Sequence, residues 1–364
     1  MDKWMCGLEI LNTLNANGYE AYFVGGVVRD YIRKAPIRDI DITTNALPNQ
    51  IAKIFTNVTM EGEVYYSCRI HVHSYTYEVT TFRKDISYVD HRHPITIPVC
   101  SLKEDLARRD FTMNAIAMDK NLTIYDEFHG TEDIQNQIIR CVGNPKVRFE
   151  EDGLRVLRAL DFASRWKYTL DKAIVESFCK DYLSVIKEEY IIEMIQKIAQ
   201  NPYDIGLKMI VEYNILRSFP FYQVVVEEAL ETKYTKHMYS LFYVLHHFLP
   251  TNIKISKKEI SLAKNMAFWI LHHFDSIALY YGDMGCLEEA IELNNILYKE
   301  NLCKDDILKR YEALPIHSAK DIHFDWKEIQ KNRSKITKKL ETAILLFQVK
   351  NEEAALKKYL EIEE

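Results

Sequence analysis

Two aspartates separated by one residue, Asp39 and Asp41, offer the clearest chemistry in the sequence. Isoleucines at 40 and 42 alternate with them, a pattern typical of a β-strand that buries the isoleucines and presents both carboxylates on the other face. Neighbouring carboxylates repel each other unless a cation lies between them, and hard oxygen ligands suit Mg²⁺. We therefore expect Asp39 and Asp41 to be catalytic and to hold two Mg²⁺ ions, which could bridge an attacking hydroxyl and a leaving pyrophosphate.

A glycine pair just upstream could bind the phosphates of such a substrate. Strand-forming residues 22–24 lead into Gly25 and Gly26, where the missing Cβ atoms let backbone N–H groups approach an anion. Residues 27–34 follow as a predicted helix with a positive N-terminus, and Arg29 adds a permanent cation. Alone, a Gly-Gly is usually a turn and an Asp-x-Asp usually surface charge, but their occurrence in one short stretch favours a nucleotide site.

This stretch resembles motif A of the class II tRNA nucleotidyltransferases and bacterial poly(A) polymerases. That family adds nucleotides to RNA 3′ ends without a nucleic-acid template. Residues 106–115 match its second motif without a gap, which implies that Arg109 positions triphosphate and sugar. Asn114 either bonds a ribose hydroxyl or holds the loop. Residues 126–133 resemble the family's hinge motif, although the usual proline and one glycine are missing.

The next motif carries residues that would choose the base. Asp152, Arg155 and Arg158 recur three apart, which on a helix places them on one face, and the run 151–155 resembles the family's Glu-Asp-x-x-Arg motif. Asp152 only accepts and Arg155 only donates hydrogen bonds, so the pair complements the amine and ring nitrogen of cytosine or adenine. Uracil and guanine would mismatch at a cost of about 1–3 kcal/mol per buried group.

An ordinary intrahelical salt bridge is the alternative for this pair, and it would be worth little. The upstream motifs favour base recognition, with Arg158 as a phosphate or stacking contact. The sequence departs from the family pattern at Asp161, where an arginine usually precedes Phe162. Either Arg165 compensates for that change or nucleotide affinity is reduced.

Residues 64–104 join these motifs. The alternation in 64–82 predicts a hairpin beside the aspartate strand, where Glu78 is either a third metal-binding carboxylate or, as we favour, an ordinary polar-face residue. Residues 84–104 contain two prolines and mixed charge, which predict a flexible loop. That loop is either a solvated connection or a lever that moves when the nucleotide changes.

Composition limits the other possibilities. With 364 residues, 48% of them hydrophobic, the chain is long enough for two or three domains. Its seven cysteines form no CxxC pair, so neither a zinc site nor a disulfide framework is expected. We find no signal segment and no apolar run of transmembrane length, and expect a cytoplasmic protein without a membrane partner. Since the net charge is −6, RNA contacts must come from local basic patches.

One such patch lies near the C-terminus. Residues 326–339 hold six Lys/Arg and one Glu, a local charge of six minus one, or +5. A charge run is usually a solvated face, but here it is a plausible site for tRNA phosphates, with Lys335, Lys338 and Lys339 as the RNA-binding residues.

The resemblance implies an α+β fold. A polymerase-β-like nucleotidyltransferase head with a small mixed sheet is expected at 1–137. An all-helical remainder would follow, with a neck containing the base-recognition helix at 138–200, a body at 201–285 and a tail at 286–364 that contacts tRNA.

The implied reaction adds CMP and AMP from CTP and ATP to the 3′ end of tRNA and releases pyrophosphate. An A-only or CC-only tRNA nucleotidyltransferase and a poly(A) polymerase remain alternatives, although the full-length loop at 84–104 disfavours CC-only addition. A non-catalytic RNA-binding protein is an alternative of another class, and retention of both aspartates argues against it. The sequence leaves the oligomeric state open.

Overall fold

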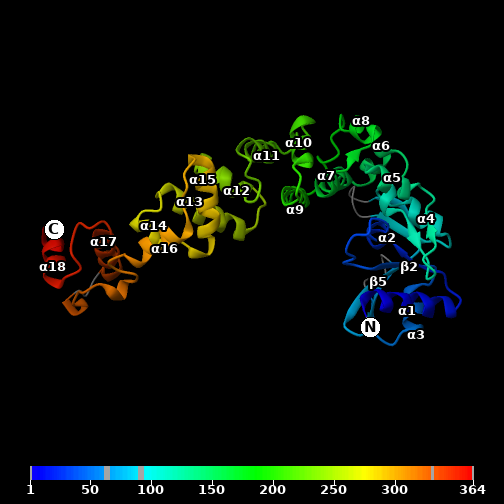
Figure 1. Cartoon of the computed structure of the whole chain (residues 1–364), viewed down its shortest axis with the longest axis horizontal. Helices are drawn as coiled ribbons and strands as arrows, with labels where there is room; N and C mark the ends of the chain where they lie inside the picture. The colour runs from blue at the N-terminus through cyan, green and yellow to red at the C-terminus, as the bar shows by residue number, and fades with distance from the viewer. Residues whose placement is uncertain (1, 61–65, 89–93, 329–331, 363–364) are drawn as a thin grey trace. The chain divides into compact units, whose positions relative to one another are not determined.

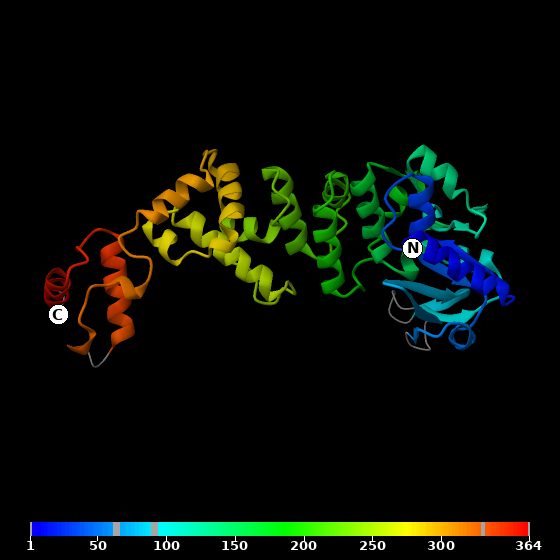
Figure 2. The same cartoon turned by 60° about the horizontal axis from the view of Figure 1, so that its bottom comes forward.

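The computed structural model of the chain describes residues 2–60, 66–88, 94–328 and 332–362. The chain forms two compact units, Met1–Gln223 and Val224–Glu364. The large sheet lies in the blue to blue-green N-terminal segment, and the rest of the chain is mainly helical (Figure 1, Figure 2). The predicted α+β architecture is therefore confirmed. The division at Gln223 lies inside the predicted body, and the predicted head, neck, body and tail boundaries stay predictions.

A mixed sheet forms the base of the first unit. Its seven described strands lie in the order β3-β4-β5-β2-β1-β8-β9, and β2 pairs with β5 in parallel while the other pairs are antiparallel. The predicted hairpin beside the aspartate strand is confirmed as β4 and β5, although residues 64 and 65 lie outside the described residues. The strands are β1 (Ala21–Val24), β2 (Asp41–Thr44), β3 (Val58–Met60), β4 (Ser67–Val72), β5 (Tyr75–Thr81), β8 (Ala117–Met118) and β9 (Ile124–Tyr125).

The sheet has a well-packed side against α1 (Lys3–Ala16). Asp2 starts this helix by accepting a hydrogen bond from the Met5 N–H at 2.8 Å. Phe23 of β1 is fully buried, and its ring centroid lies 4.9 Å from that of Trp4. The Tyr77 hydroxyl of β5 donates to the Lys3 carbonyl at 2.6 Å. These contacts hold β1 and β5, and hence the glycine turn and the aspartate strand, against one helix.

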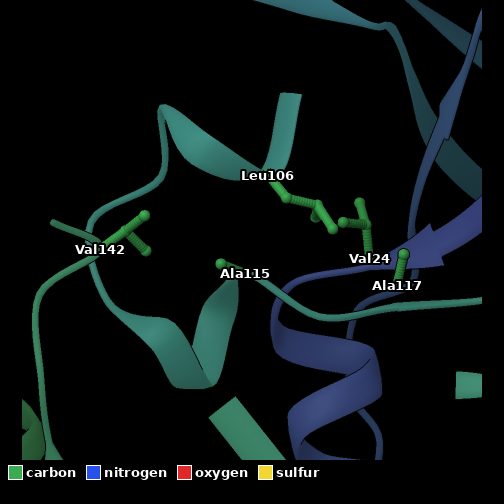
Figure 3. Close-up of a cluster of buried hydrophobic side chains, with 5 residues drawn as sticks. All are labelled: Val24, Leu106, Ala115, Ala117 and Val142. Carbon is green, nitrogen blue, oxygen red and sulfur yellow. The ribbon is translucent and has the colours of Figure 1, made fainter. Parts of the chain in front are cut away.

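A small apolar cluster connects β1 with the second family motif. Val24 and Ala117 of the sheet pack with Leu106 of α4 (Leu102–Ala107) and with Ala115 and Val142 (Figure 3). Figure 3 shows the side chains of Leu106 and Val24 close together above the turn that follows β1. The cluster therefore brings residues 108–114 next to the glycine turn, although they are far apart in the sequence.

Part of the predicted flexible loop is regular structure. Arg83–Tyr88 (β6) and Pro94–Pro98 (β7) form an antiparallel ribbon, and α4 follows, so the prediction of a loop over 84–104 is wrong for these segments. Residues 89–93 of that loop lie outside the described residues. Proline does not prevent pairing here because Pro94 and Pro98 occupy the two ends of β7, where a missing N–H costs little.

Helices complete the first unit, together with a short parallel pair, β10 (Ile138–Ile139) and β11 (Thr169–Leu170). Gly206 lets the helix α10 (Ile205–Glu212) approach α7 (Leu154–Trp166), since a Cβ there would lie 2.5 Å from Ser164 Oγ. The helices are α2 (Gly26–Ile32), α3 (Pro48–Ile54), α5 (Gly130–Asn136), α6 (Pro145–Glu151), α7 (Leu154–Trp166), α8 (Lys172–Ser177), α9 (Glu188–Ala199) and α10 (Ile205–Glu212).

Every regular element among the described residues of the second unit is a helix. Trp269 is fully buried and donates from Nε1 to the Asp283 carbonyl at 3.0 Å. Buried Glu341 accepts from the hydroxyls of Tyr280 and Tyr281 at 2.8 and 2.5 Å, which ties α17 to α14. The helices are α11 (Pro220–Thr232), which crosses the boundary, α12 (Met238–His246), α13 (Lys257–Leu271), α14 (Ser276–Tyr281), α15 (Leu287–Tyr298), α16 (Lys304–Glu312), α17 (Arg333–Leu345) and α18 (Glu353–Ile362). None of the helices in the described ranges is both long and apolar enough to cross a membrane.

Candidate active site

A cavity of about 480 Å³ in the first unit collects most of the predicted site residues. Six arginines and three aspartates line it, so its formal charge is six minus three, or +3, within a chain of net charge −6. The lining comprises Gly25, Gly26, Arg29, Asp41, Arg83, Arg108, Arg109, Asp110, Asn114, Asp152, Arg155, Arg158 and Phe162. Such a concentration of guanidinium groups suits a multiply charged phosphate ligand.

The glycine turn has a backbone that only glycine adopts easily. Gly25 has φ +74° and ψ −127°, and a Cβ on it would lie 3.2 Å from Nη1 of Arg109. The turn therefore needs glycine for its backbone conformation and for the close approach of the arginine. Gly25 and Gly26 both face the cavity at the start of α2.

Arg29 lies in the cavity wall, where four contacts fix it. It donates to both carboxylate oxygens of Asp30, at 3.0 and 3.1 Å, and to Asn114 Oδ1 at 2.6 Å. Its guanidinium also lies 4.5 Å from the ring centroid of Trp166 in α7. Since the side chain is only 10% exposed, its charge is presented in one orientation. The contact with Asn114 also means that Asn114 holds the loop in this structure, one of its two predicted roles.

Asp110 connects this arginine with the helix α7. It accepts from Asn114 Nδ2 at 3.0 Å and from Arg158 Nε at 2.8 Å. Burial alone would raise the pKa of Asp110, but the Arg158 charge and the Asn114 hydrogen bond outweigh it and lower the pKa to about 2. The same carboxylate raises the pKa of Arg158. The hydrogen-bonded series Arg29, Asn114, Asp110, Arg158 therefore orients two predicted triphosphate ligands.

Arg109 is positioned by a carboxylate that was not among the predicted site residues. Asp105 is fully buried, and its oxygens accept from Arg108 at 2.9 Å and from Arg109 at 3.0 Å. Although burial raises the pKa of Asp105, the two arginines reverse that effect and lower it. Within the described residues, Nε of Arg109 is buried without a hydrogen-bond partner. The spacing of three and four residues from Asp105 to the arginines could have indicated this cluster.

The two predicted metal ligands lie differently from expectation. Strand β2 begins at Asp41, so the prediction of a strand that includes Asp39 is wrong; Asp39 lies in the preceding connection. The Asp39 side chain is 91% exposed, and its Oδ1 lies 3.5 Å from Lys3 Nζ. Asp41 lines the cavity and is paired in register with Glu78 of β5. Ile40 and Ile42 are buried as predicted.

The surroundings of Asp41 concentrate negative charge. Desolvation and then the Glu78 carboxylate raise the pKa of Asp41, Arg109 opposes them, and Asp39 adds a smaller increase. In the described part of the chain, no three acidic, histidine or cysteine side chains form a ready metal-binding group. Mg²⁺ commonly takes only one or two protein carboxylates, because substrate phosphates and water supply its other ligands. These carboxylate oxygens beside an arginine-lined cavity therefore fit Mg²⁺ bound together with a nucleotide.

The predicted base-reading residues all reach the cavity, but not from one helix. Asp152 is the residue that follows α6, and α7 begins only at Leu154, so the prediction that one helix face carries Asp152, Arg155 and Arg158 is wrong. The break lies at Gly153, where a Cβ would be 2.1 Å from the Tyr182 carbonyl oxygen. Asp152 accepts from the Leu154 N–H at 3.0 Å, which orients its carboxylate at the start of α7.

Arg155 is held by four hydrogen bonds. Its Nη1 donates to Glu151 Oε2 at 2.7 Å and to the Arg148 carbonyl at 3.1 Å. Its Nη2 donates to the Tyr88 hydroxyl at 3.1 Å and to the Arg108 carbonyl at 3.3 Å. Of the five N–H donors in a guanidinium, these contacts within the described residues leave Nε–H for a ligand.

Comparison with known proteins identifies the family. Residues 21–140 match the family model described as the poly A polymerase head domain. The CCA-adding enzyme of Listeria innocua is 33% identical over 396 residues, covering 99% of this chain and 98% of the relative. That of Staphylococcus epidermidis is 32% identical over 354 residues, covering 90% and 88%. The chain belongs to the CCA-adding enzyme family.

Solved structures of CCA-adding enzymes share the fold. The structure of the Bacillus stearothermophilus CCA-adding enzyme in complex with CTP matches with a TM-score of 0.83 at 25% identity, covering 100% of this chain and 98% of that one. The Thermotoga maritima CCA-adding enzyme complexed with tRNA-CCA matches with a TM-score of 0.70 at 17% identity, covering 100% and 97%. The fold that the resemblance implied is therefore confirmed along the whole chain.

The residue that departs from the family pattern lies outside the cavity lining. Asp161 is 1% exposed and accepts from Arg165 at 2.6 Å and from Asn201 at 2.8 Å. Its Oδ2 also lies 3.5 Å from Lys197 Nζ. Arg165 is thus the ion-pair partner of Asp161, and Phe162 is the cavity-lining residue at this turn of α7.

The predicted RNA-binding lysines belong to the second unit. Lys335 and Lys338 are exposed on α17, and Lys339 is half-buried with its Nζ 5.7 Å from the ring centroid of Tyr359. Lys338 also lines a cavity of about 770 Å³, together with the aromatic residues Phe268 and Tyr281. Residues 329–331 of the basic run, including Lys331, lie outside the described residues.

Proposed function

We propose that this chain completes the 3′ end of tRNA by adding CMP and AMP from CTP and ATP, with release of pyrophosphate. The observation that carries the proposal is the arginine-lined cavity of about 480 Å³. Its lining brings together the predicted phosphate-binding turn at Gly25, the predicted metal ligand Asp41 and the predicted base-reading residue Asp152. The relatives are named CCA-adding enzymes along the full length of the chain. The work of such an enzyme on tRNA also makes the cytoplasm its expected location.

The triphosphate and sugar would bind among the glycine turn and the arginines. Gly25 and Gly26 line the cavity without a side chain, so a phosphate can approach their backbone, and Arg29, Arg109 and Arg158 supply charge from three different segments. Arg29 and Arg158 are already fixed by Asn114 and Asp110, so little side-chain freedom is lost on binding. As pyrophosphate leaves, these cations stabilise the negative charge that develops on it.

Asp152 and Arg155 would read the base. The Asp152 carboxylate accepts from the exocyclic amine of cytosine or adenine, and Arg155 donates to the adjacent ring nitrogen. A single donor is sufficient for that nitrogen, which agrees with the one N–H that the four described hydrogen bonds of Arg155 leave over. Uracil and guanine present a carbonyl to the carboxylate and an N–H to the arginine, and are rejected.

Asp39 and Asp41 would hold Mg²⁺, with Glu78 as a further carboxylate beside Asp41. When bound, Mg²⁺ lowers the pKa of the RNA 3′-hydroxyl and neutralises charge on the phosphates. The 3′ oxygen bonds to the α-phosphorus, and the bond from that phosphorus to the bridging oxygen of pyrophosphate breaks. In this proposal the chain's own residues hold the α-phosphate in line with the 3′ oxygen.

Lys335, Lys338 and Lys339 belong to the predicted tail, where they would contact the phosphates of tRNA. The exposure of Lys335 and Lys338 and the surplus of basic side chains on residues 326–339 support this role in an otherwise acidic protein. The aromatic residues beside Lys338 add surfaces on which a base can stack.

The test is incorporation into tRNA that lacks its 3′-terminal nucleotides, with each labelled NTP supplied singly and in pairs and the products resolved to one nucleotide. We expect CMP addition with CTP alone, a further AMP only when ATP is also present, and no UMP or GMP. Addition of A alone, of C alone or of long A tails would assign one of the related activities instead. Asp39→Ala should abolish incorporation and keep tRNA binding, whereas a wild-type chain that incorporates nothing would refute the proposal.

A further inference from the structure

The ribbon formed by β6 and β7 contacts the cavity from a side that the proposed function does not use. Its strand β6 carries Arg83, Asp85 and Tyr88, and Arg83 lines the cavity. The base of the ribbon is held by Asp105, whose Oδ1 accepts from the Arg83 backbone N–H at 3.3 Å. The other end of β6 is Tyr88, which reaches Arg155 of α7.

Tyr88 makes two directional hydrogen bonds through one hydroxyl. Because a carboxylate only accepts, the hydroxyl donates to Asp85 Oδ2 at 2.8 Å. Its oxygen then accepts from Arg155 Nη2 at 3.1 Å. Donation to a carboxylate polarises the hydroxyl and strengthens it as an acceptor. Desolvation raises the pKa of Tyr88, Arg155 opposes that increase and Asp85 adds to it, so the hydroxyl keeps the proton that it donates.

We infer that Tyr88 is a specificity-determining positioning residue, whose hydroxyl holds Arg155 in the orientation that recognises cytosine and adenine. The inference rests on the proposed function, since it assigns a role in base selection. Tyr88 itself acts through Arg155, and nothing requires it to touch the nucleotide.

The geometry of the guanidinium gives the reason. Nη1 is held by Glu151 and the Arg148 carbonyl, both of which belong to α6. Nη2 is held by Tyr88 and, at the longer distance of 3.3 Å, by the Arg108 carbonyl. Of the two hydrogen bonds that Nη2 donates, the one to Tyr88 is therefore the shorter. Without its hydroxyl, an Nη2 N–H becomes available and the guanidinium gains freedom to rotate.

That freedom would change which bases are accepted. A fixed Arg155 offers one N–H at the position of an acceptor ring nitrogen. A guanidinium with a second available N–H meets the carbonyls of uracil or guanine, which the fixed one rejects. Loss of the Tyr88 hydroxyl is therefore expected to relax selectivity more than it slows the reaction with CTP.

Tyr88→Phe tests the inference, and Tyr125→Phe is the matched control. Tyr125 also donates to an aspartate, with 3.5 Å between its hydroxyl and Asp119 Oδ2, but it lies on β9 and does not line the cavity. For each variant, kcat/KM is measured for UTP, GTP, CTP and ATP on tRNA lacking its 3′ end. Because the ratio of two nucleotides comes from one preparation, it does not depend on the fraction of folded protein.

We expect the UTP to CTP ratio of kcat/KM to rise about tenfold in Tyr88→Phe, the change typical of one lost hydrogen bond. It should rise less in Asp85→Asn, which keeps the Tyr88 hydroxyl, and stay at the wild-type value in Tyr125→Phe. An unchanged ratio in Tyr88→Phe, or an equal rise in Tyr125→Phe, overturns the inference while leaving the proposed function intact. A wild-type chain that incorporates no nucleotide refutes the proposed function itself.

Discussion

Replacing Asp110 by asparagine removes the charge that joins the second family motif to α7. Asp110 is 8% exposed and lies between Asn114 and Arg158. Asparagine has nearly the same shape, so the substitution leaves little cavity. It leaves Arg158 without its ion-pair partner and can misdirect the Asn114 side chain, which in turn holds Arg29. The substitution should therefore affect both stability and triphosphate binding.

The magnitude follows from the pKa of Asp110. The folded protein lowers it from the ordinary value of 3.8 to about 2, and a shift of nearly two units corresponds to about 2 kcal/mol of folding stability. Because the folded pKa is the lower one, ionised Asp110 stabilises the folded state above the unfolded pKa. That contribution is lost as the pH falls towards the folded pKa of about 2.

Urea titration of the full chain, with hydrogen exchange read in peptides from α7, measures the stability of this region. Asp110→Asn should lower the free energy of unfolding by about 2 kcal/mol at pH 7. The difference from wild type should stay constant above about pH 5 and shrink below pH 4, where Asp110 becomes protonated in the unfolded state. Asp119→Asn, in the turn between β8 and β9, is the control and should change little. A wild-type stability in Asp110→Asn, or a difference independent of pH down to 2, would refute this reasoning.

Three further outcomes are expected. Glu78→Gln removes a negative charge beside Asp41, which weakens the attraction for a cation, so more Mg²⁺ should be needed for half-maximal activity; an unchanged Mg²⁺ titration would exclude Glu78 from the metal site. Gly153→Ala should destabilise the first unit by about 1–3 kcal/mol in urea, because its Cβ would overlap the Tyr182 carbonyl; a more stable variant would contradict the close approach. Neutralising three lysines together should weaken tRNA binding and flatten its salt dependence, whereas an unaltered salt slope would exclude them as phosphate contacts. The lysines are Lys335, Lys338 and Lys339.

Local patterns in the sequence predicted much of the fold because they are set by near neighbours. The alternation of isoleucines with aspartates correctly gave a strand at 41–44 with a buried Ile42. The glycine pair correctly indicated a turn whose backbone conformation favours glycine, because Gly25 has a positive φ. The cavity lining also includes every catalytic, nucleotide-binding and base-reading residue predicted in the first unit except Asp39, whose side chain lies in the exposed connection before β2.

The errors arose where distant contacts decide the structure. The three-residue spacing suggested a continuous helix through Asp152, but the helix breaks where Gly153 meets the carbonyl of Tyr182, which is far along the chain. Mixed charge and prolines suggested a loop at 84–104, yet β6 is anchored by Asp105 and by Arg155. Such partners are adjacent only after folding, so periodicity could not reveal them.

If protein side chains in one cavity select the incoming base, competition between nucleotides for the same enzyme will reveal it. Wild type, Asp152→Ala and the control Asp119→Ala are each given tRNA lacking its 3′ end and an equal mixture of labelled CTP and UTP. We expect the preference for CMP over UMP to fall about tenfold or more in Asp152→Ala and to be kept in the control. An Asp152→Ala chain that still incorporates CMP with wild-type preference would contradict this expectation.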